Sequence, residues 1–216
     1  MVWMNSWKQI LVGGVALALG VGHLLAQAPA TNAPSAKDQG GLSNTTVLII
    51  RHAEKPPTGF ELTPAGIARA NAYTNYFKNL RLEGKPVKLE HLFAAEDSTK
   101  SHRSRLTLEP LAKVLAQPLD QRFAAKQGPA LADELRAKPH GSQILICWHH
   151  NATADLLTAL GADPAKLLPN GQWPDEVFNW MIELHFDAEG HLPPGAAKCV
   201  NENLMPGDAE KAPPAS

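Results

Sequence analysis

The sequence TTVLIIRHAEKPP, from Thr45 to Pro57, changes abruptly from apolar to charged residues. Residues 47 to 50 are Val, Leu, Ile and Ile, and this run without polar alternation is typical of a strand buried on both faces. Arg51 and His52 follow at the carboxyl end of the predicted strand. Because ligands in open α/β sheets bind outside the carboxyl ends of strands, we expect a functional site here.

The same arrangement occurs again about a hundred residues later. Residues 144 to 148, ILICW, form a second apolar run, and His149, His150 and Asn151 come directly after it. A single histidine behind a strand is more often a structural residue than a functional one. Two histidines at neighbouring strand ends, with arginines nearby, predict instead a cationic pocket that suits an anion better than a divalent metal.

Helical and extended patterns alternate between and after these runs. This alternation predicts an α/β fold with three layers, in which helices cover both sides of a mostly parallel central sheet. Besides the two apolar runs, we expect strands at residues 89–95 and 177–186, and helices at residues 64–81, 101–117, 129–137 and 152–160.

Composition excludes several classes of protein. The 216 residues carry a formal net charge of -1 at pH 7, and the pI is about 6.8. There is no basic tail or stripe, so we expect no nucleic-acid partner. Two cysteines, Cys147 and Cys199, are too few for a disulfide scaffold or a structural zinc site. The sequence leaves open whether they pair, although the apolar run around Cys147 favours a buried, inert thiol.

Both ends of the chain differ from the middle. Lys8 and the uncharged run at residues 10–26 predict that residues 1–28 are a signal peptide or an N-terminal anchor. Residues 29–44 have the composition of a flexible linker, and residues 201–216 that of a disordered tail. The catalytic domain is then expected at residues 45–200.

These segments predict where the protein works. Export would make the domain periplasmic or secreted, as in an exported bacterial-type protein. The alternative is anchoring by residues 10–26, and contact with a membrane is expected only if this segment is not cleaved. Cleavage after Ala26 and cleavage after Ala30 are both compatible with the sequence.

Four ordered blocks of sequence resemble the histidine phosphatase superfamily, also called phosphoglycerate mutase-like. The blocks lie at strand ends and helix starts, in the order expected of that superfamily, and together span about residues 47 to 186. They are Leu48–Glu54 (LIIRHAE), Leu62–Ala70 (LTPAGIARA), Arg103–Thr107 (RSRLT) and Ile144–Asn151 (ILICWHHN).

The resemblance implies a phosphomonoester hydrolase that acts through a phosphohistidine intermediate and needs no cofactor. It implies that His52 is the nucleophile and that His149 is the second histidine of the pocket. Arg51 and Arg103 would hold the phosphate oxygens, with Asn151 as a further substrate-binding residue. The partner would be a small phosphorylated substrate, whose identity the sequence does not contain.

Two departures from the superfamily pattern leave the general acid unassigned. The position after the second histidine is usually small or an aspartate, and here it is His150. No clear equivalent exists for the glutamate that the mutase branch carries before the second histidine. Glu54, Glu96 and Asp97 are candidates for the acid by their position near strand ends, although solvated loop carboxylates are common.

Two rival functions fit the same residues. A metal-dependent hydrolase could use His52, Glu54, His149 and His150 as ligands, but Arg51 would place a fixed positive charge beside the metal. A non-catalytic member of the same fold could bind a phosphorylated ligand without turnover.

Overall fold

The computed structural model describes residues 40 to 213, which contain one six-stranded sheet and one small two-stranded sheet. The predictions for residues 1–39 lie outside the described part. The strands are β1 (Thr46–Arg51), β2 (Arg81–Leu82), β3 (Lys85–Pro86), β4 (His91–Ala94), β5 (Leu119–Asp120), β6 (Gln143–Trp148), β7 (Trp180–His185) and β8 (Ala197–Asn201). The α-helices are α1 (Pro64–Asn79), α2 (Arg103–Leu115), α3 (Gly128–Ala137), α4 (Thr153–Ala159) and α5 (Pro164–Leu167).

The large sheet has the order β5-β4-β6-β1-β7-β8, so β1 is an interior strand as its apolar sequence predicts. β1, β4, β5 and β6 pair in parallel, whereas β7 runs antiparallel to β1. The sheet is therefore mostly parallel. Sequence analysis missed the edge strand β8, which pairs antiparallel with β7 and adds a hairpin to the parallel core.

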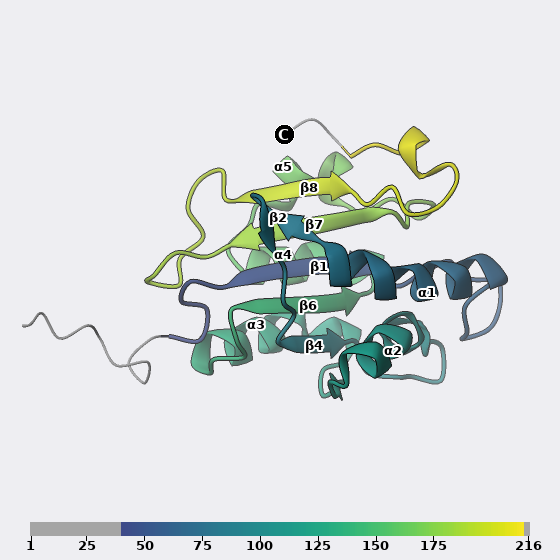
Figure 1. Ribbon diagram of the computed structural model, residues 1–216, viewed down its shortest axis with the longest axis horizontal. Helices are drawn as coiled ribbons and strands as arrows, with labels where there is room; N and C mark the ends of the chain where they lie inside the picture. Colours follow the sequence, from purple (N-terminus) through teal and green to yellow (C-terminus); the bar gives the residue numbers. More distant parts are fainter. Residues whose placement is uncertain (1–39, 214–216) are drawn as a thin grey trace, which may run out of the picture. The chain divides into compact units, whose positions relative to one another are not determined.

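Side chains alternate along β1 between two separate cores. Val47 and Ile49 pack on one side of the sheet, and Leu48 and Ile50 pack on the other, with all four fully buried. The first core includes side chains of α3, α4 and α5, and the second includes side chains of α1 and α2. Figure 1 shows α1 and α2 in front of the sheet and the other helices behind it. The predicted three-layer α/β/α arrangement is confirmed.

Helix α1 begins beside the chain that leaves β1. The Thr63 hydroxyl caps the helix by accepting a hydrogen bond from the Gly66 amide at 3.1 Å. The Thr63 amide donates to the Glu54 carbonyl at 3.0 Å. A Cβ atom on Gly66 would lie 2.5 Å from that carbonyl oxygen, so only glycine allows the helix to approach this closely.

At a few positions of α1 and α2, burial differs from what the residue type suggests. Ile67 and Val114 are apolar, but they are 54% and 56% exposed. Arg69 is charged, but only 3% of it is exposed because carboxylates surround it. Pro110 lies inside α2, which continues through it without a break.

The prediction of a disordered tail from residue 201 is wrong for residues 201 to 211. Glu202 and Asp208 are buried there, and Asp208 forms a two-point ion pair with Arg69 of α1. Glu202 accepts a 2.8 Å hydrogen bond from the Tyr73 hydroxyl, and burial raises its pKa to about 8. The polar composition of this segment predicted disorder, because composition does not show that two of its carboxylates are buried against partners on α1.

The two cysteines do not pair: Cys147 and Cys199 are both buried free thiols. Burial raises the pKa of the Cys147 thiol, in agreement with the inert role expected for it.

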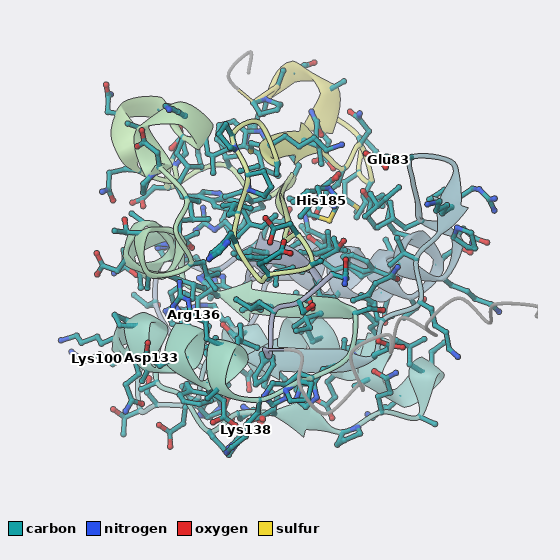
Figure 2. All side chains as sticks on the ribbon, turned by 90° about the vertical axis from the view of Figure 1, so that its left-hand side faces the viewer. Glu83, Lys100, Asp133, Arg136, Lys138 and His185 are labelled. Carbon is teal, nitrogen blue, oxygen red and sulfur yellow. The ribbon has the colours of Figure 1, made fainter. Side chains whose placement is uncertain are left out.

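No helix within residues 40–213 is long and apolar enough to cross a membrane. His185, labelled in Figure 2, ends β7 and pairs with Thr46 at the start of β1, so it lies at the end of the strands opposite to His52.

Candidate active site

The pairing of β1 with β6 brings the two predicted histidines together. Arg51 is paired with Trp148 in the parallel register, and the His52 amide donates to the Trp148 carbonyl at 3.0 Å. His52 and His149 are therefore the next residues on adjacent strand ends. Their ring centroids lie 5.3 Å apart in an edge-to-face arrangement.

His52 is held in a form that can act as a nucleophile. It is 1% exposed, and its Nδ1 lies 2.8 Å from the Ala53 carbonyl oxygen, to which Nδ1–H donates. Nε2 then carries the lone pair. Burial, with smaller contributions from the charges of Arg51, His149 and Arg103, places the His52 pKa well below 6.5. The imidazole is thus neutral at pH 7.

A hydroxyl group connects the end of β1 to the helix that carries Arg103. Thr107 of α2 accepts a hydrogen bond from the Ala53 amide at 2.9 Å and donates to the Arg103 carbonyl at 2.7 Å. Thr107, the last residue of the RSRLT block, therefore joins α2 to the chain that follows His52.

Arg51 is a fully buried cation whose position is fixed by many contacts. Its Nη1 lies 2.8 to 2.9 Å from the carbonyl oxygens of Pro174, Asp175 and Val177. Its guanidinium carbon lies 3.9 Å from the centroid of the Phe178 ring. Burial lowers the Arg51 pKa to about 10, so the group stays charged at pH 7. Its Nε has no hydrogen-bond partner among the described residues.

His150, which departs from the superfamily pattern, supports Arg51. Its Nδ1 lies 3.1 Å from Arg51 Nη2, and its Nε2 lies 2.6 Å from Asp175 Oδ1. Since Nη2 can only donate, Nδ1 accepts, and Nε2–H donates to the carboxylate. Sequence reasoning missed Asp175 and Phe178, because nothing in their local sequence connects them to a strand end more than a hundred residues away.

His149 is kept neutral by the same surroundings. Burial lowers its pKa to about 4, and the charges of Arg103, Arg51 and Lys55 add to this effect. The pKa of His150 is also lowered to about 4, first by burial and then by Arg51. A pocket in which several cations lie close together disfavours further positive charge.

Arg103 and Arg105 face different surroundings. Arg103 Nη1 donates to the Gly59 carbonyl at 3.0 Å, and its buried Nε has no partner in the described part of the chain. Arg103 also lowers the pKa of both His52 and His149. Arg105 is instead bound by Asp97 at 2.8 Å and Glu109 at 3.1 Å. Arg103 is thus the arginine of this helix that acts on the histidines.

None of the three predicted acids is bonded to the histidine pair in residues 40–213. Glu54 forms a 2.9 Å hydrogen bond with Arg69 Nε, and Asp97 is engaged by Arg105. Glu96 is exposed in the loop after β4. Asn151, predicted to bind substrate, is exposed in the short turn that precedes α4. Their roles stay predictions.

The ligand set of the rival metal hydrolase is not assembled. Within residues 40–213, no group of three or more His, Cys, Asp or Glu side chains is placed to hold a metal ion. His52 Nδ1 is occupied by a carbonyl, His150 by Arg51 and Asp175, and Glu54 by Arg69. The geometry therefore gives this alternative no support.

Comparison with known proteins finds distant similarities only among solved structures. No family model matches the chain, and no curated protein does. The protein histidine phosphatase SixA complexed with tungstate is 19% identical at a TM-score of 0.44, over 68% of this chain and 92% of that chain. Phosphoglycerate mutase from Plasmodium falciparum is 17% identical at a TM-score of 0.46, over 69% and 89%.

The putative phosphohistidine phosphatase SixA from Agrobacterium tumefaciens is 16% identical at a TM-score of 0.41, over 66% of this chain and 92% of that chain. At such identities and TM-scores these structures do not assign an activity to this chain, which has to follow from the residues of the site.

The lowered pKa values can be checked by NMR titration of the histidine rings. We expect the ring resonances of His149 and His150 to stay constant from pH 8 to pH 5.5, because each ring is neutral above its pKa of about 4. His149→Gln and His150→Gln variants identify the resonances. A titration midpoint near 6.5 for either ring would contradict the electrostatic description of the pocket.

Proposed function

We propose that this chain is a phosphomonoester hydrolase of the histidine phosphatase type, with His52 as the nucleophile. The observation that supports this most directly is the buried, neutral His52 ring. Its Nδ1–H is bound to the Ala53 carbonyl, which leaves the Nε2 lone pair for attack. A carbonyl that fixes the tautomer is what nucleophilic catalysis by an imidazole requires.

The reaction has two balanced steps. In the first, Nε2 of His52 attacks phosphorus, the bond between phosphorus and the alcohol oxygen breaks, and the alcohol leaves after taking up a proton. In the second, water attacks phosphorus, the bond between phosphorus and Nε2 breaks, and one proton of the water returns to the donor, which releases inorganic phosphate and restores the neutral ring. The proton donor of the first step is unassigned, since Glu54, Glu96 and Asp97 are not bonded to the histidines.

Charge stabilisation comes from the groups around His52. Phosphoryl transfer depends on positioning and on electrostatic stabilisation of the equatorial oxygens. Arg51 and Arg103 each have a buried Nε donor that finds no acceptor within residues 40–213, and His149 lies beside the nucleophile. A phosphoryl group would supply the acceptors that these donors lack. The alternative of a non-catalytic phospho-ligand binder uses the same pocket and differs only in turnover.

The organic part of the substrate would extend beyond this pocket. Arg103 also lines a hollow of about 340 Å³, together with Lys55 and Gly59. Lys55 adds positive charge there, which would favour an anionic phosphoester. The substrate is therefore proposed only as a small phosphorylated molecule.

Export is part of the proposal, because the sequence of residues 1–28 predicts a signal peptide or anchor. We expect the full chain, expressed in a bacterial host and fractionated, to be recovered outside the cytoplasm. N-terminal sequencing then distinguishes a cleaved chain that starts near Gln27 or Thr31 from an anchored one. Recovery in the cytosol with Met1 in place would overturn the export proposal.

Replacing the nucleophile should abolish turnover. His52→Ala is expected to lower kcat by about a thousandfold or more, because no other side chain in the pocket is held to attack phosphorus. The measurement is hydrolysis of a panel of phosphomonoesters by the full chain, with circular dichroism to verify folding. His191→Ala, at an exposed position in the connection between β7 and β8, serves as the control. Activity within a few-fold of wild type in His52→Ala would refute the covalent mechanism.

The two arginines of α2 should differ in their effect on anion binding. Arg103→Ala is expected to weaken vanadate binding by about 2 kcal/mol, or roughly thirtyfold, because it removes a charge-assisted donor. Arg105→Ala should change binding by less than about twofold, since Asp97 and Glu109 already bind that charge.

Calorimetric titration of both variants with vanadate decides between the two arginines. If Arg105→Ala loses more vanadate affinity than Arg103→Ala, the assignment of Arg103 to the pocket is wrong.

Added chelator should leave turnover unchanged, whereas a loss of activity on chelation would favour the metal-dependent alternative.

A further inference from the structure

The position of Arg51 in the phosphate pocket depends on residues 174–177, a loop that precedes β7. Three of the four carbonyl groups in residues 174–177 accept hydrogen bonds from Arg51 Nη1, at 2.8 to 2.9 Å. The Asp175 side chain of the same loop binds His150, which in turn accepts from Arg51. The loop therefore determines where the Arg51 charge lies. Asp175 and Glu176 are exposed, so packing of their side chains does not hold the loop in place.

The remaining carbonyl of this loop is bound by the C-terminal segment, residues 204–211. Lys211 Nζ donates to the Glu176 carbonyl at 2.8 Å. The Lys211 carbonyl accepts from Asn179 Nδ2 at 3.2 Å and from Trp180 Nε1, just after the loop. Lys211 thus joins the loop and the start of β7 at two points.

Asp208 fixes the C-terminal segment from the other side. Its carboxylate accepts from the Leu204 and Met205 amides at 3.0 and 2.8 Å, and so closes the segment on itself. The same carboxylate binds Arg69 at 2.8 and 2.9 Å. Arg69 also binds Glu54 at 2.9 Å, two residues after His52.

The C-terminal segment therefore contacts both parts of the chain that carry the pocket. Through Lys211 it reaches the loop that holds Arg51, and through Asp208 and Arg69 it reaches the residues that follow His52. It also forms one wall of a cleft of about 660 Å³, whose other walls include Glu54 and Phe178.

We propose that the C-terminal segment is a positioning element of the phosphate pocket, and that Lys211 and Asp208 act through the 174–177 loop and Arg69 to hold Arg51 and Glu54 in place. The consequence for anion binding depends only on the pocket, and the consequence for turnover rests on the proposed hydrolase function. Preorganised charges bind an anion without first having to be ordered, so release of the loop should weaken binding even where the fold persists.

Lys211→Met tests the loop contact without disturbing the core, because Lys211 is exposed. We expect vanadate binding to the full chain, measured by calorimetry, to weaken by about fivefold or more, since even a small displacement of a clamp lowers its effect strongly. Lys78→Met, at an exposed position in the last turn of α1, is the matched control and should stay within twofold of wild type. Vanadate affinity of Lys211→Met within twofold of wild type would overturn the proposal.

Asp208→Asn tests the second contact, and its loss of a buried ion pair also lowers stability. Cys199→Ala, a cavity-forming change in β8, provides a destabilised control at a free thiol that takes no part in the hydrogen bonds and ion pairs described above. We expect Asp208→Asn to weaken vanadate binding by about fivefold or more, and Cys199→Ala to leave it within twofold, at comparable melting temperatures. Equal effects of the two variants would show that Asp208 acts only on stability and would overturn its positioning role.

The same titrations separate this inference from the proposed function. A wild-type chain that binds vanadate but hydrolyses no phosphomonoester would refute hydrolysis, and the variant affinities would still decide the role of the segment. A wild-type chain that binds no vanadate would overturn this inference as well, because there would be no anion pocket to position.

Discussion

The burial of the Arg51 guanidinium is the constraint on which the rest of the site depends. A charge that is fully removed from water is costly unless hydrogen bonds and charges compensate for it. Here three backbone carbonyls, the His150 ring and the face of Phe178 surround it. This requirement explains why the loop before β7 folds back over the end of β1. It also explains why a histidine with an acceptor nitrogen suits the position after His149.

A buried cation has a second effect, on the neighbouring imidazoles. Arg51 and Arg103 disfavour protonation of His52 and His149, in addition to the larger effect of burial. The pocket therefore contains neutral histidines beside fixed positive charges. Such a pocket attracts an anion and at the same time keeps a lone pair on the nucleophile, which are the two conditions that attack on a phosphate group requires.

The C-terminal segment extends this electrostatic organisation to the far end of the chain. Arg69 is buried among Glu54, Glu202 and Asp208, and the network joins α1, the end of β1 and the C-terminal segment. A polar segment that composition alone classifies as disordered is thus ordered by a few charges. Removing one partner of such a buried network leaves the others uncompensated, so its members are expected to depend on one another.

The sequence by itself determined the interior strand, the histidine pair and the arginine helix. Residues 47–50 are apolar throughout because both faces of β1 are covered, and this property is local enough to read from four residues. The pattern places His52 and His149 each at the end of such a strand, and the parallel pairing of β1 with β6 then brings them side by side. The N-cap at Thr63, followed by Pro64, is likewise a local signal.

Only the tertiary structure decided which charges act together. Asp175 meets His150, Arg69 meets Asp208, and Lys211 meets the loop before β7, across separations that leave no periodic pattern in the sequence. The same holds for Arg105, whose charge is bound by Asp97 and Glu109 while Arg103 acts on the histidines. Hydrophobic patterning specifies which face of an element is buried, but the pairing of buried charges depends on where the packed elements bring single side chains, and that is a property of the fold.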